Sequence, residues 1–280
     1  MRHVASTDGV VLAVHELGGS GPLVLLAHAT GFHGRVWAPL AAHLADRARC
    51  VAPDLRGHGD STVDPGHPFH WDRFADDVLA VVDDLDPPGP ILAAGHSKGG
   101  AALLLAEQRR PGTFAALYCF EPIVFPPGRG GPPGEGDEHP LAAGALRRRQ
   151  VFPSRDEAFA NYASKPPFAS LHPDALRAYV DHGFADEPDG TVRLKCLGEN
   201  EAQVYRMGGN HGAFDRLGEV RCPVTVARGA LSPMSPAGIA EPIAAALPHG
   251  VLEVHDDLGH FGPLEDPARI ADRVAAALGL

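Results

Sequence analysis

Gly95-His96-Ser97-Lys98-Gly99 joins a short apolar run, Ile91–Ala94, to a segment with helical periodicity, Gly99–Gln108. An apolar run of this length followed by a helical pattern predicts a buried strand that turns directly into a helix. A serine between two glycines can occupy such a sharp turn, because glycine has no side chain that would clash there. The hydroxyl of Ser97 would then stand exposed above the end of the strand. Ser97 is therefore the first candidate for a reactive residue.

Short apolar runs alternate with helix-length amphipathic segments on both sides of this stretch. This alternation predicts an α/β fold, with a mostly parallel twisted sheet and helices on both of its faces. The expected strands are Val10–Glu16, Leu23–Ala27, Cys50–Pro53, Ile91–Ala94, Ala115–Phe120, Val224–Ala227 and Val251–Val254. The expected helices are Val36–Ala45, Asp72–Leu85, Gly99–Gln108, Ala237–Ala246 and Pro267–Leu278. Asp266 is expected to cap the last helix. Gly18-Gly19-Ser20-Gly21-Pro22 has the composition of a tight turn, so the first two strands are predicted to form a hairpin.

The alternation stops between residues 122 and 218, where helical patterns such as Arg155–Tyr162 and Asp174–His182 follow each other without strands. We expect a helical cap here, inserted into a core made of residues 1–121 and 219–280. The proline- and glycine-rich stretch Pro126–Gly136 predicts a flexible surface connection at its start. Nine aromatic residues of the segment either form the core of the cap or line an apolar pocket. They are Phe125, Phe152, Phe159, Tyr162, Phe168, Tyr179, Phe184, Tyr205 and Phe214.

Composition and charge exclude several classes of partner. The 280 residues are 44% hydrophobic and 21% charged, which is typical of a globular protein with a buried core. The formal net charge of −11 disfavours nucleic acid and anionic membranes as partners. The N-terminal residues lack the apolar core of a signal peptide, and no stretch of 18 uncharged apolar residues occurs. We therefore expect a cytoplasmic protein whose partner is a small molecule.

The sequence predicts neither a metal nor a cofactor. Four cysteines at positions 50, 119, 196 and 222 lie far apart, so we expect reduced, buried thiols rather than disulfides or zinc ligands. His67 and His70 are three residues apart, but no carboxylate or third ligand follows at the spacing of a metal site. The chain has no glycine-rich nucleotide-binding motif.

The stretch around Ser97 resembles the nucleophile elbow of the α/β-hydrolase family, and the resemblance extends over nearly the whole chain. His28-Ala29-Thr30-Gly31-Phe32 is similar to the oxyanion loop of that family, with Ala29 where glycine is commoner. Residues 53–61 (PDLRGHGDS) resemble a structural loop of the family. Leu258-Gly259-His260-Phe261 stands where the family places its catalytic histidine. The resemblance implies an α/β-hydrolase fold with a helical cap.

The resemblance also implies roles for individual residues. Ser97 would be the nucleophile and His260 the base that takes its proton, since a serine hydroxyl is protonated at neutral pH. The backbone N–H groups of Lys98 and Thr30 would stabilise the oxyanion that forms on the substrate.

Three side chains beside these loops have more than one possible role. His28 and His96 are expected to be structural partners of the two loops rather than catalytic groups. The side chain of Lys98 could reach an anionic substrate, but we expect an exposed lysine at the start of a helix.

The acid of the triad departs from the family pattern. The usual position lies in the turn after the first strand that follows the cap, which here reads Gly229-Ala230-Leu231-Ser232. A serine cannot carry the negative charge that stabilises an imidazolium. Some members of the family place the acid at the end of the strand after the elbow helix, where this chain has Glu121. We expect Glu121 to be the acid, although the acid could also be absent, or be Asp256 or Asp257.

The sequence therefore predicts a cofactor-independent serine hydrolase that acts on an ester, lactone or related acyl substrate with an apolar portion, through an acyl-enzyme. A C–C bond hydrolase or an acyltransferase would use the same residues. A catalytically weak ligand-binding homologue is an alternative from another class, because Ser232 replaces the usual acid. The sequence sets no oligomeric state.

Overall fold

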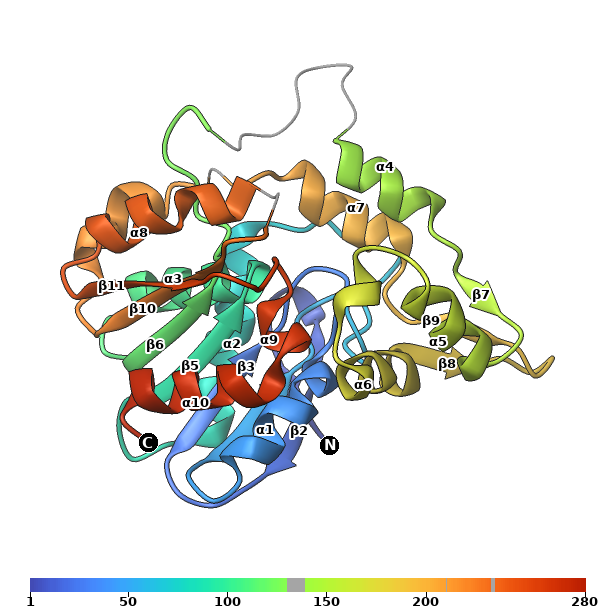
Figure 1. Cartoon of the computed structure of the whole chain (residues 1–280), viewed down its shortest axis with the longest axis horizontal. Helices are drawn as coiled ribbons and strands as arrows, with labels where there is room; N and C mark the ends of the chain where they lie inside the picture. The colour runs from blue at the N-terminus through green and yellow to red at the C-terminus, as the bar shows by residue number, and fades with distance from the viewer. Residues whose placement is uncertain (130–138, 210, 233–234) are drawn as a thin grey trace.

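The computed structural model describes residues 1–129, 139–209, 211–232 and 235–280, and its core is an eight-stranded sheet between two layers of helices (Figure 1). The strands lie in the order β1-β2-β4-β3-β5-β6-β10-β11. The pairs β1–β2 and β2–β4 are antiparallel, and all other pairs of this sheet are parallel. The strands are β1 (Arg2–Ala5), β2 (Val11–Gly18), β3 (Leu23–Ala27), β4 (Arg49–Pro53), β5 (Ile91–His96), β6 (Phe114–Phe120), β10 (Val224–Gly229) and β11 (Gly250–His255). The predicted α/β fold is confirmed.

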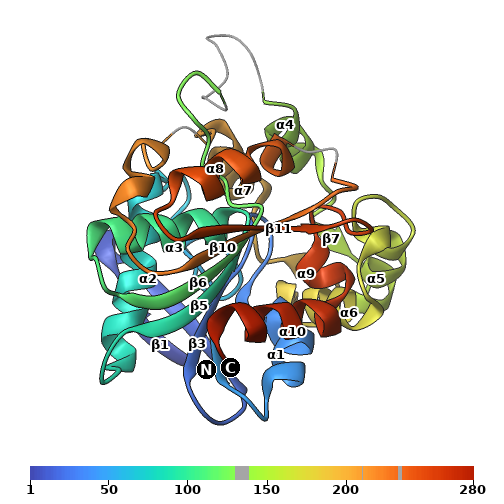
Figure 2. The ribbon, with the colours of Figure 1, turned by 60° about the vertical axis from the view of Figure 1, so that its left-hand side comes forward.

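The helices cover both faces of this sheet (Figure 2). On one face lie α1 (Ala38–Leu44) and α10 (Pro267–Leu278), and on the other lie α2 (Trp71–Leu85), α3 (Lys98–Arg109) and α8 (Ala240–Ala246). Alternate residues of β3 belong to different halves of the core: Val24 packs with the first helix layer, and Leu25 packs with the second. Strands buried on both faces read as unbroken apolar runs, which is why the sequence reveals them. The predicted cap of α10 is also present, because the Asp266 side chain accepts a hydrogen bond from Arg269 N.

The predicted hairpin between the strands now labelled β2 and β3 is wrong, since β4 lies between them in the sheet. The antiparallel partner of β2 at the sheet edge is β1, which the sequence hides because only one of its four residues is buried. The glycine-rich link instead passes close to the backbone that leads into β4. At Gly19, with φ +88°, a Cβ atom would lie 1.9 Å from the carbonyl oxygen of Ala48. Glycine is therefore needed there for close approach, not for a hairpin turn.

The predicted cap segment, residues 122–218, contains strands as well as helices. Its elements are α4 (Pro140–Arg147), β7 (Val151–Phe152), α5 (Arg155–Ala163), α6 (Pro173–Gly183), β8 (Phe184–Asp186), β9 (Val192–Leu194) and α7 (Gly198–Arg206). The three strands form a small antiparallel sheet in the order β7-β9-β8, which corrects the expectation of a strand-free segment. Strands of two or three residues are too short to show an alternating pattern. Most of the predicted connection Pro126–Gly136 lies outside the described residues.

Most aromatic side chains of the cap pack against each other. The rings of Tyr162, Phe168 and Tyr179 have centroids 4.7–5.5 Å apart, and Phe152 and Phe184 join the same cluster. These tilted and edge-on arrangements are the favourable geometries for aromatic pairs. The concentration of aromatic residues is thus explained chiefly by the core of the cap.

The four cysteines are free and buried, as expected for reduced thiols. Among the described residues, no helix combines the length and the apolar character needed to cross a membrane.

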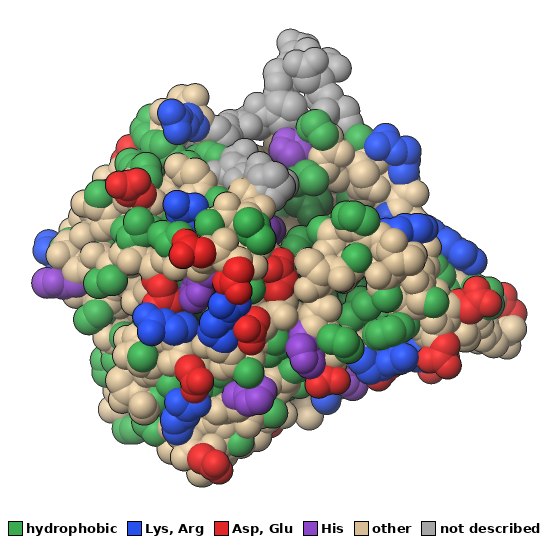
Figure 3. Space-filling view, viewed as in Figure 1, with side chains coloured by type: hydrophobic (Ala, Val, Ile, Leu, Met, Phe, Trp, Pro, Cys, Tyr) green, Lys and Arg blue, Asp and Glu red, His purple; other side chains and the backbone are tan. Residues whose placement is uncertain are grey.

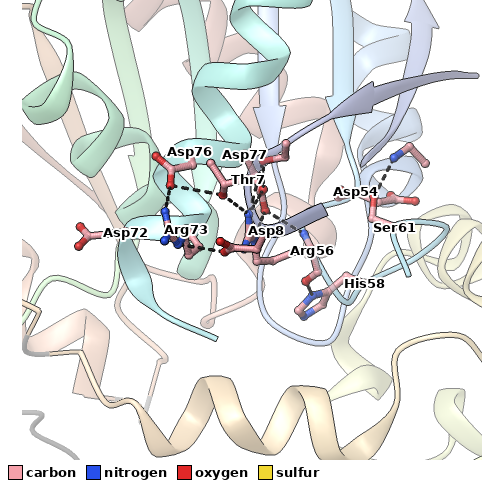
Figure 4. A network of polar contacts seen from close by, with 12 residues as sticks. Thr7, Asp8, Asp54, Arg56, His58, Ser61, Asp72, Arg73, Asp76 and Asp77 are labelled. Carbon is pink, nitrogen blue, oxygen red and sulfur yellow. Dashed lines mark hydrogen bonds and ion pairs between the residues drawn. The ribbon is translucent and has the colours of Figure 1, made fainter. Parts of the chain in front are cut away.

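A buried ion pair fixes the loop that follows β4 (Figure 4). The Arg56 guanidinium is fully buried and donates from Nε and Nη2 to the two carboxylate oxygens of Asp77 on α2, at 2.9 and 2.7 Å. Its Nη1 donates to Asp8 near the N-terminus at 3.2 Å. Arg56 therefore ties three distant segments of the chain together, in accordance with the structural role expected for residues 53–61.

Replacing Arg56 by alanine should lower the free energy of unfolding by about 3–5 kcal/mol, because the buried carboxylate of Asp77 loses its partner. Equilibrium denaturation in urea would measure the change. Arg73→Ala is the matched control: Arg73 also pairs with Asp8, but its side chain is 38% exposed. Its loss should cost less than about 1 kcal/mol. Equal effects of the two substitutions would contradict the structural role of Arg56.

Candidate active site

Ser97 occupies the sharp turn between β5 and α3. Its backbone has φ +54° and ψ −115°, a conformation that residues other than glycine rarely adopt. The glycines on either side are required by contact: a Cβ at Gly99 would lie 2.1 Å from the carbonyl oxygen of Ala27, and one at Gly95 would lie 2.7 Å from Gly100 N. The tight packing around this turn holds Ser97 in its strained conformation.

Glu121 and His260 are in direct contact. Glu121 follows the last residue of β6, and its fully buried Oε2 lies 2.6 Å from Nδ1 of His260. The other oxygen, Oε1, accepts a hydrogen bond from Gly229 N at 3.0 Å. A carboxylate at this distance favours the tautomer that carries its proton on Nδ1 and leaves Nε2 of His260 free to accept one.

Ser232 also contacts Glu121, and the sequence analysis did not predict this contact. Its hydroxyl donates to Oε2 of Glu121 at 3.1 Å. The contact arises because β6 and β10 are parallel neighbours that end at the same edge of the sheet, with Phe120 opposite Ala227. The residue at the usual acid position therefore holds the carboxylate supplied by the neighbouring strand.

The two alternative acids lie elsewhere. Asp256 and Asp257 are both exposed, and Asp257 pairs with Arg269 at 2.8 Å. Of the carboxylates that the sequence leaves open, Glu121 is the one that the structure places on His260.

A tether joins the histidine loop to the elbow. Nε2 of the buried His96 donates to the carbonyl oxygen of His260 at 2.8 Å, and the two rings lie 4.9 Å apart. His260 is thus held beside the neighbour of Ser97, although no hydrogen bond joins the described side chains of Ser97 and His260 in this structure. Catalytic hydrogen bonds of this kind are often formed fully only with substrate. His28 has a similar structural role, since it accepts a hydrogen bond from Leu55 N at 2.9 Å.

Two backbone N–H groups near Ser97 donate to no acceptor in the part of the chain that the structure describes. Lys98 is the first residue of α3, and the N–H groups of a first helical turn have no acceptor within their helix. Thr30 lines the same pocket as Ser97, and its N–H donates to no acceptor among the described residues. The N–H of Lys98 thus lies at the positive end of α3, directly after Ser97 in the chain, whereas that of Thr30 comes from the loop after β3.

A pocket of about 200 Å³ opens above Ser97. Its wall is largely apolar and includes Trp71, Ile123, Phe125 and Val204. Figure 3 shows the surface hollowed beside the cap, with hydrophobic side chains in the hollow. Of the nine cap aromatics, Phe125 and Tyr205 line the pocket described here. The expectation that these aromatics line a pocket therefore holds for a minority of them, because most form the core of the cap.

Comparison with known proteins agrees with this geometry. Residues 24–273 match the model of a family described as the Alpha/beta hydrolase family.

The chain belongs to the alpha/beta hydrolase family.

Its relatives include the lipase LipV of Mycobacterium tuberculosis, with 28% identity over 96% of this chain and 98% of that protein. A probable protein phosphatase methylesterase 1 of Caenorhabditis elegans is 38% identical over 67% of this chain, but the match spans only 53% of that protein. The crystal structure of E-2-(acetamidomethylene)succinate hydrolase superposes with a TM-score of 0.81 and 25% identity, over 100% of this chain and 98% of that one. An enol-lactonase of Burkholderia xenovorans shares the fold, with a TM-score of 0.74, 18% identity and full coverage of both chains. The family match and these relatives show that the chain is a hydrolase.

The side chain of Lys98 in this alpha/beta hydrolase is buried, which corrects the expected exposed lysine. Its Nζ lies 3.2 Å from Nε2 of His58 and 4.7 Å from the centre of the Phe74 ring. The helix begins directly below the elbow, so its first side chain enters the space between α2 and the loop after β4. Burial lowers the pKa of Lys98 to about 7, although negative groups such as Asp77 act in the opposite direction.

One group of possible metal ligands comes together among the described residues of the hydrolase, namely His15, Asp54 and Asp60. Asp54 already accepts hydrogen bonds from Gly34 N at 2.6 Å and Asp60 N at 2.8 Å, and lies 2.9 Å from His15 Nε2. Asp60 is paired with Lys195 at 2.7 Å. These hydrogen bonds and ion pairs explain why the three side chains lie close together, because they fix the loop that follows β4.

Glu121→Gln should retain the fold and lose most of the activity, because an amide cannot stabilise the imidazolium of His260. The comparable amide substitution in the serine-protease template lowers kcat by about 10⁴. Turnover of an activated ester would measure the loss. Asp257→Asn is the control, and its activity should be unchanged. If Asp257→Asn loses activity while Glu121→Gln keeps it, the acid is Asp257 and not Glu121.

Ser232→Asp gives a second arm to this experiment. In the otherwise unchanged protein it places a carboxylate beside Glu121, and repulsion between them should reduce activity at neutral pH. In the Glu121→Gln background the same aspartate should restore part of the lost turnover. Failure of both effects would show that residue 232 lies outside the reach of His260.

The stability of the protein should rise with pH above neutrality through Lys98. Its folded-state pKa of about 7 lies below the value of an unfolded lysine, so the unfolded chain binds more protons above pH 7. This difference stabilises the fold by up to about 1.4 kcal/mol per pH unit, until the pKa of the unfolded lysine is approached near pH 10. Urea denaturation of wild type and Lys98→Met at pH 7 and pH 9 isolates this contribution. The free energy of unfolding of Lys98→Met, relative to that of wild type, should be higher at pH 7 than at pH 9. If this relative value is the same at both pH values, Lys98 is not the source of the pH dependence.

Proposed function

We propose that this chain is a cofactor-independent serine hydrolase of carboxylic esters or lactones. The contact of 2.6 Å between the Glu121 carboxylate and His260 Nδ1 is the observation that carries the proposal. It gives the histidine a fixed orientation and a negative partner, which a base for serine activation needs. The elbow conformation of Ser97 supports the same proposal.

In the proposed reaction, Ser97 Oγ attacks the carbonyl carbon of the substrate while His260 Nε2 takes its proton. The carbonyl oxygen becomes an oxyanion and receives hydrogen bonds from the N–H groups of Thr30 and Lys98. His260 then gives the proton to the leaving alkoxide, and an acyl-enzyme remains on Ser97. Water then attacks the acyl carbon while His260 takes its proton, and His260 returns that proton to Ser97 Oγ as the bond between the serine oxygen and the acyl group breaks. Glu121 stays ionised throughout and stabilises the imidazolium.

The pocket suggests the size and polarity of the substrate. A volume of about 200 Å³ suits a small acyl or alcohol group, and the side chains of Ile123 and Phe125 favour an apolar one. Removal of apolar surface from water contributes roughly 25 cal/mol per Å², before the costs of ordering the substrate. We therefore expect a small-molecule substrate with an apolar portion.

The relatives named above support ester or lactone hydrolysis, since they include a lipase, a probable methylesterase and an enol-lactonase. The ligand-binding alternative rested on the absence of an acid at position 232, and the carboxylate of Glu121 removes that reason. Hydrolysis is favoured over acyl transfer as the simplest use of the same residues.

A fluorophosphonate probe should label the native protein at Ser97, because only an activated serine attacks phosphorus at a useful rate. Peptide mass spectrometry would locate the label. Ser97→Ala should remove both the label and esterase activity, whereas Ser232→Ala, which removes a different hydroxyl of the site, should still be labelled at Ser97. A label on another residue in an active, folded enzyme would overturn the mechanism.

A panel of 4-nitrophenyl esters tests the apolar pocket. Lengthening the acyl chain from acetate to butyrate should raise kcat/KM, because the added methylenes leave water. An unchanged or falling kcat/KM across this series would mean that the pocket does not take the acyl group.

A further inference from the structure

A group of polar side chains is buried between the cap and the loop at residues 28–32. We call it the cap cluster: Arg148 directly after α4, Tyr162 on α5, Tyr179 on α6, and Glu201 and Tyr205 on α7. Arg148 and Glu201 form an ion pair, and the hydroxyl of Tyr205 donates to Glu201 Oε1 at 3.2 Å. The five side chains come from three helices and from the residue that follows α4, so the cluster exists only in the folded cap.

The cluster has hydrogen-bond donors without acceptors. Nε of Arg148 and the hydroxyls of Tyr162 and Tyr179 are buried without a well-aligned hydrogen-bond partner among the described residues, although the two hydroxyls interact with each other and Arg148 interacts with the Cys196 thiol. The two tyrosine rings lie 5.5 Å apart in an edge-on arrangement, and both phenols interact electrostatically with Arg148. Buried donors are satisfied in nearly all native structures, so several of them in one place need an explanation. An acceptor supplied by a ligand would satisfy them.

The charges of this region also leave room for an anion. Glu201 is the carboxylate that pairs with Arg148, while the buried Lys98 nearby has no carboxylate in hydrogen-bond contact among the described residues. Asp77, which acts on Lys98 at longer range, is held by the two hydrogen bonds from Arg56. Arg148 is the permanent cation of this region, whereas Lys98, whose pKa burial lowers to about 7, is only partly charged at neutral pH. An anion bound beside them would favour the charged form of Lys98.

The cluster adjoins the proposed reaction centre. Tyr205 lines the pocket that contains Ser97, and the hydroxyl of the same tyrosine contacts Glu201. Glu201 Oε1 lies 2.6 Å from the position that a Cβ would take at Gly31, the residue after Thr30. The side chain of Arg148 is 16% exposed, although its Nε is buried.

We propose that the cap cluster binds a carboxylate of the substrate, so that the hydrolysed ester or lactone carries a free carboxylate as well as its apolar portion. Nε of Arg148 and the hydroxyls of Tyr162 and Tyr179 donate to this carboxylate, and Glu201 holds the guanidinium from its other side. Arginine suits this role because its planar donors match the geometry of a carboxylate. The inference rests on the proposed function, since it assigns a substrate class to the same reaction centre.

Two esters that differ only in charge provide the test. The mono-4-nitrophenyl ester of glutaric acid carries a free carboxylate, and its methyl ester is neutral and nearly equal in size. We expect wild-type kcat/KM to favour the acid by about tenfold or more, which is the size of a charge-assisted hydrogen bond. Free glutarate should inhibit hydrolysis of the neutral ester competitively.

Arg148→Gln should abolish this preference and the inhibition by glutarate, because it lowers kcat/KM for the acid about tenfold more than kcat/KM for the neutral ester. Arg147→Gln is the matched control, because Arg147 is the preceding residue and is exposed. It should behave as wild type. Tyr179→Phe keeps the ring and removes one hydroxyl, so it should reduce the preference even if Arg148→Gln does not fold.

The outcomes separate this inference from the proposed function. Equal kcat/KM for the two esters in wild type, or a preference that survives both Arg148→Gln and Tyr179→Phe, would overturn the carboxylate site while Ser97 chemistry still stands. If neither ester is hydrolysed and no probe labels Ser97, the proposed function fails instead. Calorimetry with glutarate then decides on the cluster alone: binding that Arg148→Gln removes supports it, and no binding overturns it.

Discussion

The contact between the Glu121 carboxylate and His260 is the interaction on which the candidate site depends. It requires β6 and β10 to lie side by side and parallel, so that Glu121 ends its strand within reach of Gly229 N and of His260. The carboxylate is fully buried, and a buried charge is tolerated only with partners for its oxygens. Backbone N–H, hydroxyl and imidazole supply these partners. The chemistry of the site therefore depends on the packing of these two strand ends.

The sequence predicted the parts of the fold that depend on local patterns. Strands buried on both faces read as apolar runs, and Asp266 with Pro267 marks the start of the last helix. The pairing of strands is not local, so the sequence could not show that β4 separates β2 from β3. The helix α7 was missed for another reason. It buries Asn200 and Glu201, so its polar residues do not mark an outer face.

The candidate site was predictable to the extent that chain position implies spatial position. The strand ends that carry Ser97 and Glu121 meet because their strands are neighbours in the sheet, which the resemblance implied. The buried side chain of Lys98 was not predictable, because a charged residue after a turn is exposed far more often than not. The hydrogen bond from Ser232 to Glu121 was hidden for a similar reason. A single serine in a turn carries no sign of its partner.

The presence of a carboxylate at position 121 and of a serine at position 232 has a physical explanation. A histidine ring needs a carboxylate oxygen at Nδ1, and it does not matter to the ring which backbone supplies it. Glu121 reaches Nδ1 from the end of β6, where its backbone turns sharply with φ +43°. The turn after β10 then needs no charge of its own, and it contributes Gly229 N and the Ser232 hydroxyl as donors to the same carboxylate. An aspartate at position 232 beside Glu121 would put two negative charges where one is stabilised. Ser232 thus complements the Glu121 carboxylate as a hydrogen-bond donor instead of supplying a second charge.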